Sequence, residues 1–380
     1  MAELIAPRSA EEAAAVMKQA SDKGLRVACS DSVSGEADIV LSSRNLNSIA
    51  EYEPADLVIA VGSGATLGQI GSAVAPNNQF LALDPPVADR ATVGGITAAA
   101  SAGPLRFAHG TPRDQVLGLE VVTGDGRILS FGGRVVKNVA GYDVVRLMVG
   151  SRGTLGFITR VNLRLKPKPQ VDRTIAITSD SFTAVGAASD AIVMMGLEPV
   201  ALELLSASIA AHITGNEGWV LLARVQGNVE AAAAALEAMQ SCAPGTRVTE
   251  HETDVWPRLS AIEAGSRVVI RLANLRSLLP DTIATTLRIA QETGCTNARI
   301  AAHAGNGIVR LLADEIDYER TALLMSERKQ IEQTGGSLII ERAEIPNVEA
   351  YGHSDGARLM RGIKKIFDPA GVMGAERFSI

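Results

Sequence analysis

The chain has 380 residues, of which 47% are apolar and 21% charged, a composition typical of a globular protein with about two domains. A net charge of −6 with only 3% aromatic residues disfavours a nucleic-acid-binding protein. No apolar run approaches the roughly 18 residues that cross a bilayer. The N-terminus, MAELIAPRSAEEAAAV, has acidic residues where an export signal has a basic start, so we expect a cytoplasmic protein.

The three cysteines, Cys29, Cys242 and Cys295, are odd in number and widely spaced. This spacing argues against a disulfide framework and against an iron-sulfur cluster held by cysteines of this chain alone. An iron-sulfur centre would therefore belong to a partner protein.

Short strands and helices are predicted for the N-terminal segment. A helix over residues 9–23 has Ser9 as its N-cap, Glu12 completing a capping box and Gly24 as its stop. The following predicted elements are strands at LRVACS, ADIVLSS and DLVIAVG, a helix at TLGQIGSAVAP and an extended segment at QFLALDPP. This order indicates an α+β fold and not a regular βαβ repeat.

The segment VIAVGSGATLGQI imitates a dinucleotide-binding turn. Gly62, Gly64 and Gly68 follow a strand and open a helix, and Asp84 lies further on at the end of the next extended segment. That segment runs into a double proline, so no right-handed crossover to a parallel strand can continue from it. A plain strand-turn-helix unit is favoured over an NAD(P) site.

A second glycine-rich segment, TVGGITAAASAG, has a backbone almost without side chains on one side. Gly94, Gly95 and Gly103, with the run Ala98-Ala99-Ala100 between them, would let a planar ring and a pyrophosphate approach the main chain. Free amides there would bind anions. The alternative is a small-residue helix packed closely on a sheet.

The next segment is predicted to begin with a hairpin, VLGLEVVTGDGRILSFGG, that turns at Gly124-Asp125-Gly126. From Phe131 to Pro169, glycines recur around the apolar runs VVRLMVG and FITRVNLRLKP, a pattern that suits a site for a large flat cofactor. Two roles stay open for Tyr142 and Asp143: direct contact with the cofactor, or a buried hydrogen-bonded pair that fixes the loop.

The segment LRLKPKPQVDR predicts a linker at about residues 166–172. Beyond it we expect an antiparallel sheet with helices on one face. The predicted strands are WVLLARVQG, SRVVIRLAN, ARIAAHAG, GIVRLLA and SLIIERA, and the predicted helices are EAAAAALEAMQSC, PDTIATTLRIAQETG and DYERTALLMSERKQIEQTG. The tail RLMRGIKKIFDPAGVMGAERF is predicted to be a basic amphipathic helix, an Asp-Pro turn and an extended end.

These glycine segments resemble flavoproteins of the vanillyl-alcohol oxidase type, which have the PCMH-type FAD-binding fold. The run GGRVVKNVAGYDVVRLMVGS resembles the FAD-binding E-type subunits of bacterial glycolate oxidases. The resemblance implies an FAD-binding domain over residues 1–168, an α+β cap domain over 169–345 and a C-terminal segment over 346–380 that returns to the FAD domain. It implies FAD contacts by Pro85, Thr92, Gly94, Gly95, Gly103, Gly110, Asp114, Lys137, Asn138, Gly141, Tyr142, Asp143, Gly150, Gly153, Thr154, Gly156 and Ile158. Because the glycine segments are intact and a plausible linkage loop has no His or Cys apart from Cys29, we expect the FAD to be bound non-covalently.

The first loop departs from this family. Where the family has a run of glycines near a basic residue, this chain has CSDSVSG, starting at Cys29 and ending at Gly35. One glycine remains, and Asp31 would repel a phosphate. Two segments therefore imply FAD, and the third opposes it.

The cap carries a fourth set of candidate residues, which are His303, Arg310, Glu341 and Arg342. Related 2-hydroxy-acid dehydrogenases bind a divalent metal with a His-x6-His pair and a later Glu, and use the next His as base. Arg310 and Arg342 stand where this chain would need the second ligand and the base. Arginine can neither ligate a metal nor accept a proton at neutral pH, so we expect no metal site. Gripping a substrate carboxylate and forming salt bridges stay open as roles for these arginines.

The resemblance implies a glycolate oxidase subunit that oxidises glycolate or D-lactate to the 2-oxo acid. Its partners would be a catalytic D-type flavin subunit and an iron-sulfur subunit, and membrane association would come only through them. The alternatives are a non-catalytic structural subunit with weak or no FAD binding, and a stand-alone D-2-hydroxy-acid dehydrogenase.

Overall fold

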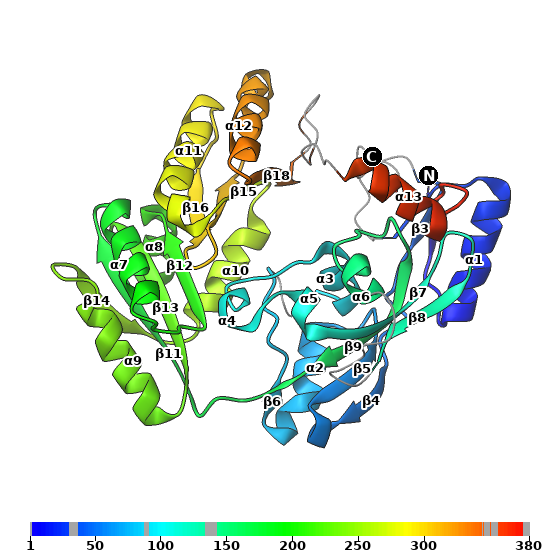
Figure 1. The fold of residues 1–380 in the computed structure, drawn as a ribbon, viewed down its shortest axis with the longest axis horizontal. Coiled ribbons are helices and arrows are strands. Elements are labelled where there is room, and N and C mark those ends of the chain that lie inside the picture. The colour runs from blue at the N-terminus through cyan, green and yellow to red at the C-terminus, as the bar shows by residue number, and fades with distance from the viewer. Residues whose placement is uncertain are drawn as a thin grey trace. The chain divides into compact units, whose positions relative to one another are not determined.

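The computed structural model describes residues 2–29, 37–86, 91–133, 143–343, 345, 350 and 356–374. The chain divides into two compact units (Figure 1). Unit 1 comprises residues 1–103, 110–168 and 353–380, and unit 2 comprises residues 104–109 and 169–352. The short segment 104–109 therefore belongs to unit 2, although the chain on both sides of it belongs to unit 1.

Unit 1 contains three sheets. A five-stranded antiparallel sheet has the order β4-β5-β9-β7-β8, a parallel sheet the order β1-β3-β2, and β6 pairs with β10. Its elements are β1 (Glu3–Ile5), α1 (Ala10–Lys23), β2 (Val27–Ala28), β3 (Ile39–Leu41), β4 (Ile49–Glu53), β5 (Val58–Gly62), α2 (Leu67–Val74), β6 (Gln79–Phe80), α3 (Val93–Ala99), α5 (Pro112–Gln115), β7 (Val116–Val122), β8 (Ile128–Gly132), α6 (Val144–Met148), β9 (Phe157–Arg164), β10 (Lys166–Pro167) and α13 (Ala357–Phe367).

The first helix forms where the sequence predicts it. The Ser9 side chain accepts a hydrogen bond from the Glu12 amide, and Gly24 ends the helix in the left-handed region with φ of 65°. The predicted capping box differs in one bond, because the Glu12 carboxylate accepts from the Arg8 amide at 2.7 Å. Ala13, Met17 and Ala20 form the buried stripe of this helix.

The dinucleotide-like turn is a plain strand-turn-helix unit. Strand β5 pairs antiparallel with both β4 and β9, so it cannot belong to a parallel nucleotide-binding sheet. A Cβ at Gly62 or Gly64 would collide with the Leu46 or Ser43 carbonyl oxygen, respectively. The two glycines therefore let Ser43 and Leu46 pack closely against the end of β5 and the turn after it. The preference for a plain strand-turn-helix unit is confirmed.

The predicted hairpin is β7 and β8, which pair antiparallel. Its turn contains Gly126 with φ of 82°, a conformation that favours glycine. The core of unit 1 packs on the five-stranded sheet. Ile59 of β5, Val121 of β7 and Val161 of β9 pack with Ile70 of α2 and Val93 of α3.

The linker between the two units is shorter than the sequence predicts. Lys166–Pro167 pairs with Gln79–Phe80, and the next strand already begins at Val171. Only residues 168–170 lie between these strands, so part of the expected linker is ordered β-structure.

Unit 2 is built on an eight-stranded antiparallel sheet with the order β14-β11-β13-β12-β16-β17-β15-β18. Its elements are α4 (Arg106–His109), β11 (Val171–Ser179), α7 (Phe182–Met194), β12 (Ala201–Leu205), α8 (Ala207–Thr214), β13 (Trp219–Gly227), α9 (Val229–Ser241), β14 (Arg247–His251), α10 (Val255–Gly265), β15 (Val268–Ala273), α11 (Leu279–Glu292), β16 (Arg299–His303), β17 (Ile308–Ala313), α12 (Ala322–Gln333) and β18 (Ser337–Arg342).

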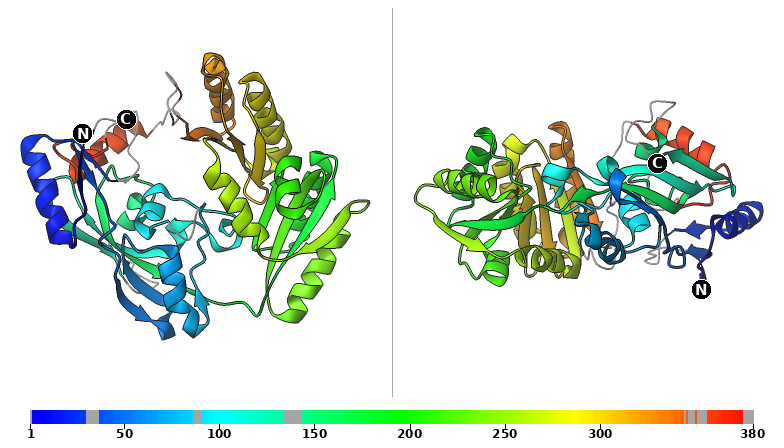
Figure 2. Two further views of the ribbon diagram at one scale, coloured as in Figure 1. Left: turned by 180° about the vertical axis from the view of Figure 1, so that it is seen from behind. Right: turned by 90° about the horizontal axis from the view of Figure 1, so that it is seen from below.

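Helices cover both faces of this sheet, not one face as expected (Figure 2). Successive strand residues point to opposite faces. Ile175 of β11 packs in one core cluster with α7, α9 and α11, whereas the next residue, Ala176, packs in another with α8 and α10. The sequence analysis did not predict α8 and α10, and this omission produced the one-face expectation.

The C-terminal helix α13 is fastened to unit 1 at its C-terminal end. The buried Asp368 carboxylate accepts from the amides of Val372 at 3.0 Å and Met373 at 2.8 Å. The Lys364 ammonium pairs with Asp368 and donates to the Thr154 carbonyl at 2.8 Å. None of the helices in the described part of the chain is long and apolar enough to cross a membrane.

Candidate functional site

A pocket of about 400 Å³ lies in unit 1, beside α3 and the start of β9. It is lined by Cys29, Leu41, Ser42, Ser43, Arg44, Thr92, Gly94, Gly95, Ala98, Gly153, Gly156, Phe157 and Ile158. Two predicted segments therefore meet at one pocket, the one that contains Gly94 and Gly95 and the one that contains Gly153 and Gly156. Small-molecule and cofactor sites have this size.

Glycine is required in the pocket walls for packing. A Cβ at Gly94 would lie 2.7 Å from the Ser63 Cβ, and one at Gly153, where φ is 75°, would lie 2.8 Å from the Cys29 Cβ. Gly95 differs, because a Cβ there would meet only the Thr92 hydroxyl oxygen, at 3.1 Å. The space next to Gly95 is thus open to the pocket.

The amides of Gly94 and Gly95 are not free, contrary to the anion-receptor argument. The Gly94 amide donates to the Ser63 carbonyl at 2.8 Å, and the Gly95 amide donates to the Thr92 hydroxyl at 3.2 Å. Arg44 supplies a cation in the pocket lining, and its Nε donates to the Ser42 hydroxyl at 3.1 Å. The sequence analysis missed Arg44, which lies after a predicted strand and outside the family's glycine segments.

Several other predicted contacts have local structural roles. A Cβ at Gly103 would collide with the Asp84 carbonyl oxygen, and the neighbouring Pro85 is buried. Gly110, with φ of 78°, packs against the Asp114 carboxylate, which accepts from the Thr111 amide at 2.8 Å. These residues shape the chain on either side of α4 and are not part of the pocket lining.

In the later glycine segment, too, some of the predicted residues line the pocket and others have local structural roles. Asp143 is an exposed N-cap of α6 and pairs with Arg146 at 2.7 Å, so it is not half of a buried pair. The Gly150 amide donates to the Thr97 carbonyl at 3.0 Å, and the Thr154 hydroxyl donates to the Ser151 carbonyl at 2.6 Å. The remaining predicted contacts, Lys137, Asn138, Gly141 and Tyr142, lie outside the described residues, as do residues 30–36 of the first loop.

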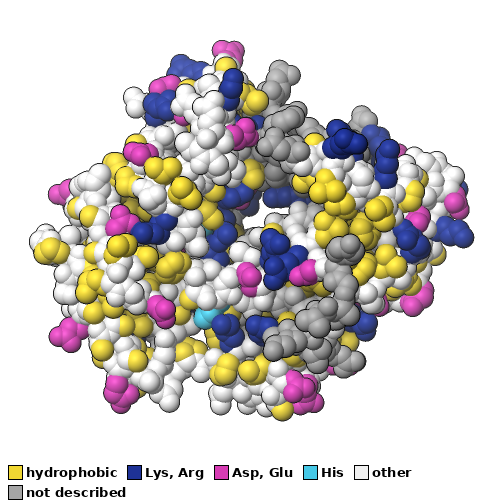
Figure 3. Space-filling model, in the orientation of Figure 1, with side chains coloured by type: hydrophobic (Ala, Val, Ile, Leu, Met, Phe, Trp, Pro, Cys, Tyr) yellow, Lys and Arg dark blue, Asp and Glu magenta, His cyan; other side chains and the backbone are white. Residues whose placement is uncertain are grey.

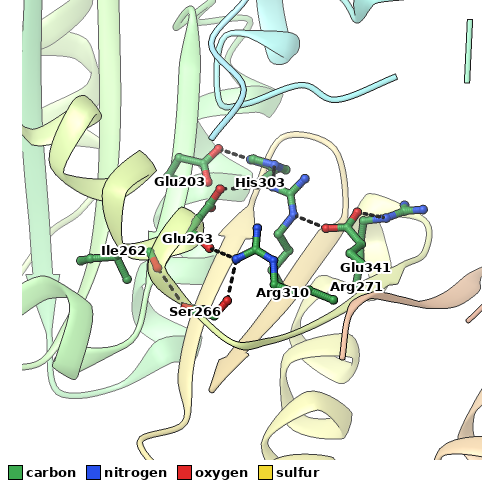
Figure 4. Close-up of polar contacts among 9 residues, drawn as sticks. Glu203, Ile262, Glu263, Ser266, Arg271, His303, Arg310 and Glu341 are labelled. Atoms are coloured by element: carbon green, nitrogen blue, oxygen red, sulfur yellow. Dashed lines mark hydrogen bonds and ion pairs between the residues drawn. The ribbon is translucent and has the colours of Figure 1, made fainter. Parts of the chain in front are cut away.

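In unit 2, the structure brings together His303, Arg310 and Glu341 (Figure 4). His303 ends β16, Arg310 lies in the middle of β17, and Glu341 lies near the end of β18. The neighbours of these residues along the strands, Ala302, Val309 and Ile340, pack under α9, α11 and α12 on one face of the sheet. Because side chains alternate, the three polar side chains point to the opposite face, the one that carries α10.

His303 is bonded at both ring nitrogens. Its Nδ1 lies 2.6 Å from the Glu203 carboxylate, and its Nε2 lies 2.6 Å from an Arg310 guanidinium nitrogen. A guanidinium can only donate, so Nε2 must accept and the ring proton must be on Nδ1, where it is donated to Glu203. Burial and the nearby Arg310, Arg106 and Arg271 cations hold the pKa of His303 well below its usual value. His303 is therefore neutral at neutral pH.

Arg310 is buried among three carboxylates. Its Nε donates to Glu341 at 3.2 Å, and its guanidinium lies 3.7 Å from Glu263 of α10. Glu341 also accepts from Arg271 at 2.9 Å. Burial alone would lower the pKa of Arg310, but Glu263, Glu341 and Glu203 together raise it. Burial raises the pKa of Glu263, against the lowering effect of Arg310.

Arg342 does not join this network. Its guanidinium donates to three main-chain carbonyls at the end of α10: Glu263 at 3.4 Å, Ala264 at 2.7 Å and Ser266 at 2.6 Å. A cation at a helix C-terminus satisfies carbonyls that have no partner within the helix and complements its dipole. Arg342 therefore caps α10 and holds it on the sheet.

Arg106 of α4 adds a further cation. Its Nε is buried and has no hydrogen-bond partner in the described part of the chain. Burial lowers the pKa of Arg106, and the Arg310 and Arg271 cations lower it further. The short helix is held in unit 2 by Phe107, whose ring lies where a Cβ at Gly305 would be.

Sequence reasoning found His303, Arg310 and Glu341 but missed Glu203, Glu263 and Arg271. A signal for Glu203 was present, because it is the one carboxylate in the apolar strand ALELL. Among the described residues, no three His, Cys, Asp or Glu side chains are placed to hold a metal ion together.

Comparison with protein families decides the class of this chain. Residues 1–132 match the model of an FAD binding domain, and residues 168–377 match the C-terminal domain of FAD linked oxidases. The second match alone covers more than half of the 380 residues. The chain belongs to the FAD-linked oxidases. Its cofactor is FAD.

Curated relatives of this FAD-linked oxidase include two glycolate oxidase subunits. The chain is 27% identical to GlcD of Bacillus subtilis over 412 aligned residues, 97% of the chain and 87% of the relative. It is 44% identical to GlcE of Escherichia coli over 128 residues, 33% of the chain and 37% of the relative. It is 33% identical to a D-lactate dehydrogenase of Archaeoglobus fulgidus over 231 residues, 57% of the chain and 51% of the relative.

Solved structures confirm the PCMH-type fold. p-Cresol methylhydroxylase with bound substrate superposes with a TM-score of 0.78 at 16% identity, covering 97% of this chain and 86% of the other. The isoeugenol complex of 4-ethylphenol oxidase from Gulosibacter chungangensis gives a TM-score of 0.76 at 16% identity, covering 97% and 87%. The expectation of an α+β, two-domain PCMH-type fold is confirmed.

The pocket of unit 1 fits FAD in its chemistry. An added Cβ at Gly95 would meet only the Thr92 hydroxyl oxygen, so backbone surface faces the pocket there and can accept a flat group. Arg44 offers a positive charge in the lining, as a pyrophosphate requires. The first loop's loss of glycines thus does not remove every feature that FAD binding needs.

Proposed function

We propose that this FAD-linked oxidase is the E-type subunit of a glycolate oxidase complex, which oxidises glycolate or D-lactate to the 2-oxo acid. The 44% identity to GlcE over 128 residues, against 27% identity to GlcD over 412 aligned residues, supports the E type. In this proposal the partners are a catalytic D-type flavin subunit and an iron-sulfur subunit that takes the electrons.

A bound FAD would supply a two-electron acceptor for oxidation of the hydroxy acid. The pocket residues Thr92, Gly94, Gly95, Gly153, Gly156 and Ile158 are proposed to hold it, with Arg44 near a phosphate. The chain's own contribution is binding and orientation, because the cofactor supplies the oxidising group.

The observation that carries the proposal is the closed network around Arg310. Oxidation of a hydroxy acid needs a base for the hydroxyl proton, worth roughly 10²- to 10⁴-fold in rate. His303 has both nitrogens bonded and a depressed pKa, and an arginine follows Glu341. These residues cannot provide the base unless the buried cluster comes apart, which favours dependence on a catalytic partner.

The test is dye reduction with glycolate and with D-lactate, first by the isolated chain and then after co-expression with D-type and iron-sulfur subunits. We expect turnover only in the co-expressed complex, and no rescue of the isolated chain by added Zn²⁺ or Mn²⁺. Turnover of roughly 10 per second by the isolated chain would favour a stand-alone dehydrogenase. Failure to co-elute with either partner on size exclusion would contradict the subunit role.

A second candidate is a non-catalytic structural subunit that has lost tight FAD binding. The same closed network supports it, as do the glycine-poor first loop and the in-chain acceptors of the Gly94 and Gly95 amides. Flavin content separates the two candidates. About one FAD per purified chain supports the first, and a colourless chain that still assembles with its partners supports the second.

A further inference from the structure

Helix α13 presents an apolar strip and a basic strip side by side. Leu359 and Ile366 are 69% and 62% exposed, and Met360 is 42% exposed. Leu359 and Ile366 are seven residues apart, which places them on one line along the helix. Such exposure of large apolar side chains on one element indicates a contact surface.

Arg358, Arg361 and Lys365 are exposed on the neighbouring strip of α13. None of them forms an ion pair within the described part of the chain, and the helix itself contains no acidic residue. The chain as a whole carries a net charge of −6, so this cationic strip is a local feature. Figure 3 shows dark-blue and yellow side chains together where Figure 1 draws α13.

The helix is a preformed and firmly attached element. Phe367 and Asp368 are buried, and Lys364 bonds to the carbonyls of Thr154 at 2.8 Å and Met373 at 2.6 Å. These contacts fix which side of the helix faces the core, and leave Leu359 and Ile366 outward. No folding of α13 is needed before it meets a partner surface.

The size and charge of the surface favour a lipid partner. Eleven helical residues span about 17 Å, so one face of α13 is far smaller than the roughly 800 Å² per partner of a stable protein interface. A helix with apolar residues on one side and Lys and Arg on the other binds the headgroup region of an anionic bilayer. Each cation near such a surface adds about fivefold in affinity.

We propose that α13 attaches this protein to an anionic lipid bilayer, with Leu359 and Ile366 inserted among the headgroups and Arg358, Arg361 and Lys365 facing lipid phosphates. The proposal needs no oxidase activity and no partner subunit. It goes beyond the proposed function, which includes no contact between this chain and a membrane.

Sedimentation of the full chain with vesicles tests it, using phosphatidylcholine alone and phosphatidylcholine with about 30% phosphatidylglycerol. We expect binding to the anionic vesicles only, weakening as salt shortens the Debye length from about 10 Å at 0.1 M to about 3 Å at 1 M. Equal binding to both vesicle types would overturn the electrostatic part of the proposal, and binding to neither would overturn all of it.

Two variants locate the binding site. Leu359→Asn with Ile366→Asn should lower vesicle affinity by at least about tenfold. Removing three cations by Arg358→Gln, Arg361→Gln and Lys365→Gln should lower it about a hundredfold. All five side chains are exposed, so the thermal unfolding of both variants should match that of the parent chain.

The matched control is Met194→Asn with Met195→Asn at the end of α7, where the side chains are 78% and 61% exposed. We expect vesicle binding by this control to equal that of the parent chain. A loss as large as that of the Leu359 and Ile366 variant would overturn the assignment to α13. If that variant instead kept vesicle binding but lost a partner subunit, α13 would be a protein interface and the lipid proposal would be wrong.

Discussion

Arg310 stands where the resemblance places a metal-ligating histidine, and its surroundings explain how the cap tolerates the exchange. A cation is still present, held by Glu341 and Glu263, and the His303 ring still has a positively charged neighbour at Nε2. The guanidinium therefore neutralises the carboxylates that converge there. The same bonds fix His303 in one tautomer, with its proton toward Glu203.

The neutral state of His303 predicts a pH dependence of stability. Its folded pKa lies below the unfolded value of 6.5, so below pH 6.5 the unfolded state binds a proton that the folded state does not. The stabilisation is complete above pH 6.5 and falls as pH is lowered, by about 1.4 kcal/mol per pH unit.

Urea denaturation of the parent chain and of His303→Gln, at about pH 7.5 and about pH 5.5, measures this effect. Glutamine keeps one donor and one acceptor but does not titrate. We expect the stability difference between parent and variant to shrink as pH falls. A difference that is the same at both pH values would show that His303 does not stay neutral in the folded chain.

Removing the Arg310 charge should destabilise the cap strongly. Arg310→Met leaves Glu263 and Glu341 near one another with less compensation, and we expect a loss of about 3 kcal/mol. The control is Arg173→Met, whose partner Glu250 is exposed and whose loss should cost less than about 1 kcal/mol. Equal losses in the two variants, measured by denaturant unfolding, would contradict a buried network.

Helix α3 lines the pocket in which we propose that FAD binds. Its N-cap hydroxyl and the Ser63 carbonyl already accept the Gly95 and Gly94 amides, so the helix offers a surface without side chains more than a set of free donors. Gly94 is needed for packing on Ser63, whereas Gly95 is exposed and borders the pocket. Only Gly95 can therefore test the pocket without disturbing the fold.

We expect Gly95→Leu to retain less than about a tenth of the parent's flavin, because the new side chain occupies pocket volume. Gly71→Leu is the matched control, since Gly71 is also an exposed helical glycine and nothing lies within 4 Å of its added Cβ. Flavin released from each purified variant by acid is measured by absorbance. Full flavin content in Gly95→Leu would place the cofactor elsewhere.

Elements with strong local signals could be predicted from the sequence. Helix α1 has its own cap and stop residues, and the β7-β8 hairpin has a glycine turn. In the cap, strands β11, β12 and β14 and helices α7, α8 and α10 were not predicted. Helices α7 and α8 are small and apolar nearly all round and show little periodicity. Burial in a large sheet, which is a tertiary effect, decides their structure.

The residues of the unit 1 pocket and of the unit 2 polar network also differ in how far the sequence predicts them. The resemblance assigned the glycine segments to one site, and Gly94, Gly95, Gly153 and Gly156 do line one pocket. Glu263 and Arg271 could not be assigned, because they meet Arg310 and Glu341 only through the packing of α10 and the pairing of β15 with β18. Glu203 meets His303 through the pairing of β12 with β16, and its place in an apolar strand was its one local signal. Arg342 was grouped with Arg310 by its neighbour Glu341, but it caps a helix instead.

For the whole molecule, the two units have separate tasks. Unit 1 has a pocket lined by glycines and Arg44, and unit 2 has a sheet on which His303, Arg310 and Glu341 bond to one another. We therefore expect that the isolated chain holds FAD but does not transfer a substrate's hydride to it at an enzymatic rate.

Whether the isolated chain reduces its flavin is measured by anaerobic addition of D-lactate or glycolate to the purified chain, with the flavin absorbance at about 450 nm as the readout. We predict a flavin band that stays unbleached over minutes and bleaches only when the catalytic partner is added. Bleaching of the isolated chain at roughly 10 per second would contradict the account.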